Sequence, residues 1–279
     1  MRRPVPIYLA PILAAALCAL PGRAWAQEAL DPGSINITYH GGPLLQHVRV
    51  ATLFCGQSWT ASRLPAYFDD FFRALFADGR FLANLAQYSA GGYQIGNGEF
   101  AATATDEQTP PARVTDAQIQ AEIGAQVAAS QLPVPDDDTV YFVFTPPHVV
   151  VVDRDGADSV NDFAGYHDYS TGSSGFPYAV IPYSDQLADA RLMTLTASHE
   201  LAEAVTDPQP APSTLGWYDD QNGEIGDIPV SLFAAGQIGR QDFVDVLGGP
   251  GGPRYVVQKE WSVQDAAPIA FAPAPAVTP

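Results

Sequence analysis

The sequence contains little cysteine and little positive charge. Its 279 residues include 2 cysteines, and its 13 lysine and arginine side chains stand against 31 acidic ones, which gives a formal net charge of −18. Such a field repels phosphate groups, so we expect no nucleic acid as a partner and, once the signal described below is removed, no membrane. Cys18 lies in that signal, which leaves Cys55 alone and excludes an internal disulfide. Because Cys55 follows an apolar run, we expect a buried, unreactive thiol.

The first 26 residues have the pattern of a secretory signal peptide. Arg2 and Arg3 form a positive start, Ile7–Leu20 forms an apolar stretch, and Ala24–Ala26 forms a small-x-small cleavage site. We therefore expect a secreted protein, extracellular or periplasmic. Removal of the signal takes away three arginines and no acid, so the acidic excess of the remaining chain is larger still.

The rest of the chain has the composition of a folded domain. A content of 47% hydrophobic and 11% aromatic residues is enough to bury a core. Apolar runs predict strands and helical spacing predicts helices, in an alternating order: strands over 48–54, 139–145, 149–152 and 178–181, and helices over 64–76, 115–132 and 185–205. This order predicts an α/β fold, with a mixed sheet flanked by helices. We expect one domain over 27–265, followed by an Ala/Pro-rich flexible tail over 266–279.

The last predicted helix carries the motif with the clearest chemistry. His199 and Glu203 are four residues apart, so both side chains project from one helix face and can bind the same ion. Glu200 is rotated by about 100°, where it can act as general base on a water bound beside them. This is the logic of the H-E-x-x-H zinc helix, with glutamate in place of the second histidine. A carboxylate is also a zinc ligand, so the pattern predicts a zincin-like active-site helix.

Further acidic residues follow this helix. Glu224 lies 21 residues after Glu203 and is the expected third metal ligand, and Asp227 lies three residues further on. His167, in a Gly-Tyr-His-Asp-Tyr segment, could instead complete the metal site or donate to the transition state, and we class it as catalytic together with Glu200. The third ligand thus stays open among His167, Glu224 and Asp227. The same Asp-, Asn- and Gly-rich segment is also typical of a polar turn or of a calcium-binding loop.

Several segments together resemble one protein family. They are Ile37–Leu45, Val48–Val50, Gly165–His167, Tyr178–Tyr183, Ser198–Pro208, Gly216–Asp227 and Tyr255–Ser262. The chain in these segments is similar to the bacterial branch of the phosphate-induced, EXORDIUM-like secreted proteins. The resemblance implies a secreted protein and, for the bacterial branch, a zinc-dependent hydrolase without an established substrate. The plant members, which are associated with growth, lack the H-E-x-x-E helix.

The motif and the resemblance lead to one expected function and one alternative. We expect a secreted zinc-dependent hydrolase, a metallopeptidase that uses metal-activated water on a peptide or protein substrate. The alternative is a non-enzymatic EXORDIUM-like protein in which the same acids hold a structural Ca²⁺.

Overall fold

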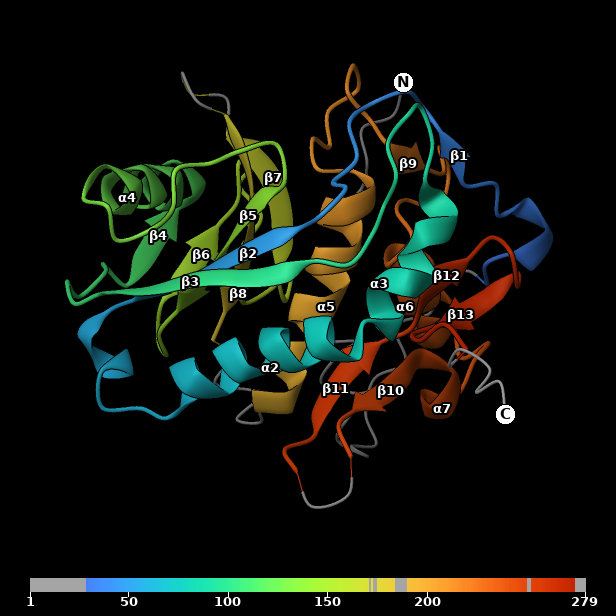
Figure 1. Cartoon of the computed structure of the whole chain (residues 1–279). Coiled ribbons are helices and arrows are strands. Elements are labelled where there is room, and N and C mark those ends of the chain that lie inside the picture. The colour runs from blue at the N-terminus through green and yellow to red at the C-terminus, as the bar shows by residue number, and fades with distance from the viewer. Residues whose placement is uncertain (1–28, 171, 173–174, 184–189, 250–251, 274–279) are drawn as a thin grey trace, which may run out of the picture.

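The centre of the molecule is a five-stranded sheet. The computed structural model describes residues 29–170, 172, 175–183, 190–249 and 252–273. The strand order is β3-β2-β5-β8-β7 (Figure 1). These strands are β2 (Arg49–Cys55), β3 (Glu99–Asp106), β5 (Thr139–Thr145), β7 (Tyr166–Ser170) and β8 (Phe176–Pro182). Strands β3, β2, β5 and β8 run parallel, and β7 is antiparallel to β8. The predicted α/β fold with a mixed sheet is confirmed.

Helices cover both faces of this sheet because its central strands are apolar on both sides. On one face α2 (Leu64–Asp78) and α5 (Ala190–Thr206) pack in a core that includes Val50 and Phe54 of β2. On the other face α4 (Asp116–Ala128) packs with Ala51 and Leu53 of the same strand. Alternate side chains of one strand therefore enter two different cores, as the uninterrupted apolar run predicts.

The remaining elements are short. They are the 3₁₀ turns η1 (Pro32–Ser34), η2 (Gln57–Trp59) and η3 (Ala86–Tyr88); the helices α3 (Arg80–Leu85), α6 (Asp227–Ala234) and α7 (Arg240–Phe243); and the strands β1 (Thr38–Tyr39), β4 (Arg113–Thr115), β6 (Val150–Val152), β9 (Trp217–Tyr218), β10 (Val244–Leu247), β11 (Tyr255–Gln258), β12 (Glu260–Ser262) and β13 (Ala267–Ile269). The short strands form two-stranded sheets: β1 with β9, β10 with β11, β12 with β13, and β4 with β6. The C-terminal pairs lie on the α5 side of the sheet (Figure 1).

The core on the α4 face contains a polar cluster, which we call the Asp116 cluster. The Asp116 carboxylate is 5% exposed and accepts hydrogen bonds from the hydroxyls of Tyr166 and Tyr178, at 2.8 and 2.5 Å. The Gln120 side chain donates to the other carboxylate oxygen at 2.7 Å. Asp116 follows Thr115, which caps α4 in the capping box that the sequence predicts.

The chain termini and one cysteine also bear on the sequence predictions. Residues 1–26, the predicted signal, lie outside the described residues, and so do 274–279 at the other end. The prediction of a flexible tail from 266 onward is wrong for its first part, because Ala267–Ile269 pair with β12 and Ala270 is buried. Cys55 is buried and free, as predicted, and burial raises the pKa of its thiol to about 12. Among the described helices, none has the length and apolar character needed to cross a bilayer.

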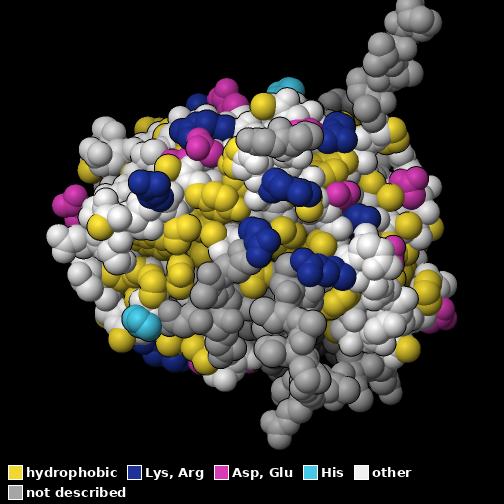
Figure 2. Space-filling view, turned by 90° about the horizontal axis from the view of Figure 1, so that it is seen from below, with side chains coloured by type: hydrophobic (Ala, Val, Ile, Leu, Met, Phe, Trp, Pro, Cys, Tyr) yellow, Lys and Arg dark blue, Asp and Glu magenta, His cyan; other side chains and the backbone are white. Residues whose placement is uncertain are grey.

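Several basic side chains lie on one face of the molecule. Figure 2 shows lysine and arginine side chains gathered on the face seen from below, although the chain as a whole is strongly acidic. The acidic side chains that concern the site described next are instead largely inside the molecule.

Candidate metal centre

Helix α5 buries charged side chains in the interior of the protein. His199, Glu200 and Glu203 are only 3%, 1% and 4% exposed, because the helix packs between the sheet strands β7 and β8 on one side and β11 on the other. Buried charges are costly unless they are paired or bind an ion. The helix therefore requires compensating partners, and they come from three other parts of the chain.

Those parts are the edge strand of the sheet, the segment after α5, and the C-terminal strands. Strand β7 supplies His167, the loop after β9 supplies Glu224, and α6 begins at Asp227. Strands β11 and β12 supply Gln258 and Glu260, both fully buried. The centre is thus assembled from residues nearly a hundred positions apart in the sequence.

Two glycines allow these segments to approach α5. A Cβ atom on Gly226 would lie 2.5 Å from His199 Nδ1 and 2.7 Å from Glu203 Oε1, and one on Gly165 would lie 2.8 Å from Glu200 Oε1. Such distances are shorter than van der Waals contact. Glycine is therefore required at both positions for the close approach of the backbone to the charged groups.

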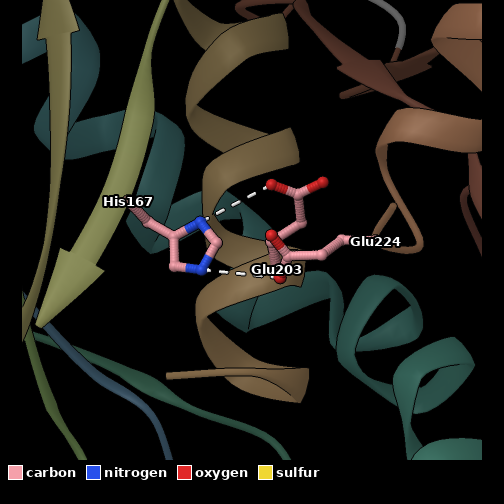
Figure 3. Close-up of side chains that lie close together, drawn as sticks. All are labelled: His167, Glu203 and Glu224. Atoms are coloured by element: carbon pink, nitrogen blue, oxygen red, sulfur yellow. Dashed lines mark ion pairs between the residues drawn. The ribbon is translucent and has the colours of Figure 1, made fainter. Parts of the chain in front are cut away.

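The acidic and imidazole groups meet at Glu203. Its Oε2 atom lies 3.2 Å from His199 Nε2 and 3.5 Å from His167 Nδ1. Glu224 approaches the other side of the His167 ring, with Oε1 3.6 Å from Nε2, and Figure 3 shows this ring facing both carboxylates. Two groups of three residues could each hold a metal ion: His167, Glu203 and Glu224 form one, and His199, Glu203 and Asp227 the other.

The structure therefore distributes the residues predicted from the sequence over these two groups. His199 and Glu203 lie together on one helix face, as predicted. Among the described residues, Glu224 is grouped with His167 and Glu203, while Asp227 is the acid grouped with His199. Glu200 lies beside His167, with Oε2 3.6 Å from its Nδ1 atom.

Hydrogen bonds hold both imidazole rings in place. His167 Nε2 lies 3.0 Å from the backbone oxygen of Asp207. Because a carbonyl oxygen can only accept, Nε2 carries the proton, and the lone pair of neutral His167 is on Nδ1, which faces Glu200 and Glu203. The ring of His199 is held by the Gln258 side chain, whose nitrogen lies 2.9 Å from Nδ1 and also donates to Gly226 O at 2.7 Å.

Gln258 and Glu260 are parts of the site that the sequence reasoning missed. The sequence gives no clear signal for them, because Gln258, Lys259 and Glu260 form a run of three polar residues where β11 ends and β12 begins. The sequence also does not contain the packing that places the end of β11 beside His199.

The site contains most of the unpaired buried polar atoms in the described part of the chain. Of eight such side-chain atoms, six belong here: Glu200 Oε1, Glu203 Oε1, Asp207 Oδ2, Glu224 Oε1, Gln258 Oε1 and Glu260 Oε1. Buried polar groups in native proteins almost always have partners. Five carboxylate oxygens without a donor, next to two imidazoles, are therefore the donor set of a group that can hold a metal ion.

The buried groups of the site shift one another's pKa values strongly. Burial alone lowers the pKa of both histidines, but the neighbouring carboxylates outweigh it and raise both pKa values well above the usual range. Burial and repulsion from Glu203 raise the pKa of Asp227 to about 7, and burial raises the pKa of Glu260 to about 8. The pKa of Glu203 is lowered to about 2, because the attraction of the two histidines outweighs its burial. Of these carboxylates, Glu203 is the one whose charged form the two histidines stabilise most.

Comparison with family models, with curated proteins and with solved structures finds no match to this chain. The resemblance to EXORDIUM-like proteins therefore stays a prediction, and the function has to be argued from the site itself.

Proposed function

We propose that the protein is a secreted zinc-dependent hydrolase, in which α5 supplies metal ligands and a general base. The observation that carries the proposal is the set of buried, unpaired carboxylate oxygens that surround two oriented imidazole rings. The zincin-like reading of α5, the zinc ion and secretion are all parts of this proposal.

The choice of zinc rests on the ligand types and their spacing. Zinc ligands at about 2.0–2.2 Å in tetrahedral geometry are about 3.4 Å from one another. The two atom pairs at Glu203, at 3.2 and 3.5 Å, are close to this spacing, and one pair belongs to each group of three residues. Calcium prefers six to eight oxygen ligands at about 2.3–2.6 Å, so two imidazoles make the alternative of a structural Ca²⁺ site less favourable.

The residues around the metal position support hydrolysis. A bound zinc ion would polarise a carbonyl group and lower the pKa of a coordinated water. Glu200 has an unpaired Oε1 atom, is rotated away from the pair His199 and Glu203 on the helix, and is therefore the group that accepts the proton of the attacking water. Once protonated, Glu200 can transfer that proton to the leaving group. Glu200 Oε2 lies 3.6 Å from His167 Nδ1, so this carboxylate is beside a candidate metal ligand.

The substrate class proposed is a peptide or protein, since attack by activated water on an acyl carbon can hydrolyse a peptide bond. The substrate would reach the site from the side of the loop after β9, where Glu224 is 12% exposed while His199 and Glu200 are buried.

The test uses Glu200→Gln in the full secreted chain, loaded with zinc. We expect hydrolysis of an unstructured protein substrate such as casein by the wild type, loss of that activity in the variant, and equal zinc content in both. The matched control is Glu122→Gln, which changes a glutamate on α4 that contacts Gln126 and should keep full activity.

Two outcomes contradict the proposal. If the zinc-loaded wild type has no activity on protein or peptide substrates, the protein is not a peptidase. If Glu200→Gln releases the metal, Glu200 is a ligand and its assignment as general base is wrong.

A further inference from the structure

We propose that the centre holds two divalent ions, bridged by the carboxylate of Glu203. This inference rests on the proposed function, because it describes the same metal site. It starts from the two groups of three residues, which have Glu203 in common and otherwise use different ligands. His167 and Glu224 lie on one side of Glu203, and His199 and Asp227 on the other.

The contacts of Glu203 fit a bridging role. Both histidines approach its Oε2 atom, and its Oε1 atom is buried without a partner. A carboxylate can bridge two metals, and the ions of two-metal hydrolytic centres are about 3.5–4 Å apart. If only one ion were bound, by His199, Glu203 and Asp227, two candidate ligand atoms would bind no metal. They are His167 Nδ1 and Glu224 Oε1, the second of which has no hydrogen-bond partner among the described residues.

One histidine is held in the way expected of a metal ligand. Histidines that bind metals usually donate the proton of their other ring nitrogen to a carbonyl, carboxylate or water. His167 has this arrangement, because Nε2 donates to Asp207 O and Nδ1 faces Glu203. His199 presents Nε2 to Glu203, and its Nδ1 lies 2.9 Å from the Gln258 side-chain nitrogen. Each ring thus directs one nitrogen at Glu203.

The experiment is a zinc titration of the full chain after chelator treatment, followed by elemental analysis of the gel-filtered protein. We expect two zinc ions per chain in the wild type and one in each of Asp227→Asn and Glu224→Gln. Asp220→Asn changes an exposed acid of the same loop and should keep two. Circular dichroism of each variant verifies the fold, and zinc K-edge absorption of the wild type should show a metal–metal distance of about 3.5–4 Å.

The outcomes separate this inference from the proposed function. One zinc per chain, or two without a short metal–metal distance, overturns the bridged centre and leaves a mononuclear hydrolase intact. No bound zinc overturns both.

Discussion

Two buried polar clusters lie on opposite faces of the same sheet, and they differ in one respect. In the Asp116 cluster, every carboxylate oxygen accepts a hydrogen bond, from Tyr166, Tyr178 or Gln120. In the cluster around Glu203, carboxylate oxygens of comparable burial have no donor. The sequence puts acidic residues in both places, so composition does not explain the difference.

The difference distinguishes a structural cluster from a group of residues that could hold a metal ion. A buried acid whose partners are all provided by the chain stabilises the fold and needs nothing further. A group of acids that the chain leaves unpaired lowers stability until a ligand binds, and histidines among them indicate a metal. Substitutions in the two clusters should therefore have opposite signatures in stability and in metal binding.

The largest expected effect is stabilisation of the wild type by zinc. With free zinc at about a hundred times Kd, linkage adds about 2.7 kcal/mol to the free energy of unfolding, which corresponds to a rise in Tm of about 5–10 °C. Glu203→Gln should abolish this rise, because Glu203 belongs to both groups of ligands. Differential scanning calorimetry with and without zinc measures it, and an equal rise in both proteins would place the zinc elsewhere.

A substitution in the other cluster should change stability and leave zinc binding alone. Asp116→Asn replaces a charged acceptor of three hydrogen bonds, and we expect a loss of about 2 kcal/mol in the free energy of unfolding, equal with and without zinc. Urea denaturation monitored by tryptophan fluorescence provides the value. A loss of zinc affinity in this variant would show that the two clusters are not independent.

A smaller effect, on zinc affinity, is expected for substitution of Gln258, which contacts His199. Gln258→Met keeps the side-chain volume but removes the contact with Nδ1, and zinc affinity should fall about tenfold, or about 1.4 kcal/mol. Gln120→Met, the corresponding change in the Asp116 cluster, should leave the affinity unchanged. Competition with a chromophoric chelator measures both, and equal affinity of Gln258→Met and wild type would remove Gln258 from the site.

The smallest expected effect is the change in the free energy of unfolding of Glu224→Gln, measured in excess chelator so that no metal is bound. Burial and nearby acids outweigh the attraction of His167 and raise the pKa of Glu224 well above the usual range, which favours the neutral carboxyl in the metal-free protein. A neutral amide of the same size should then change the unfolding free energy by less than about 0.5 kcal/mol. A loss of 2 kcal/mol or more, measured by urea denaturation, would mean that Glu224 stabilises the fold without a metal.

The sequence predicts the local parts of this molecule better than their assembly. The apolar runs of β2 and β5 and the capped start of α4 follow from neighbouring residues, and so does the shared helix face of His199 and Glu203. The sequence does not predict strand β3, because its alternating Ala and Thr residues give only a weak apolar pattern.

The rest of the site depends on contacts between distant segments. His167 meets α5 only because β7 pairs with β8, and Gln258 meets His199 across 59 residues. The division of ligands into two groups around Glu203 likewise follows from where the loop after β9 passes the helix. No spacing in the sequence contains that information.

The central claim, that the cluster around Glu203 binds zinc, is tested most directly by equilibrium dialysis of the chelator-treated chain against zinc. The account predicts stoichiometric binding by the wild type and by Asp116→Asn, and a severe loss of binding in Glu203→Gln. Equal zinc in all three proteins, or none in the wild type, would contradict it.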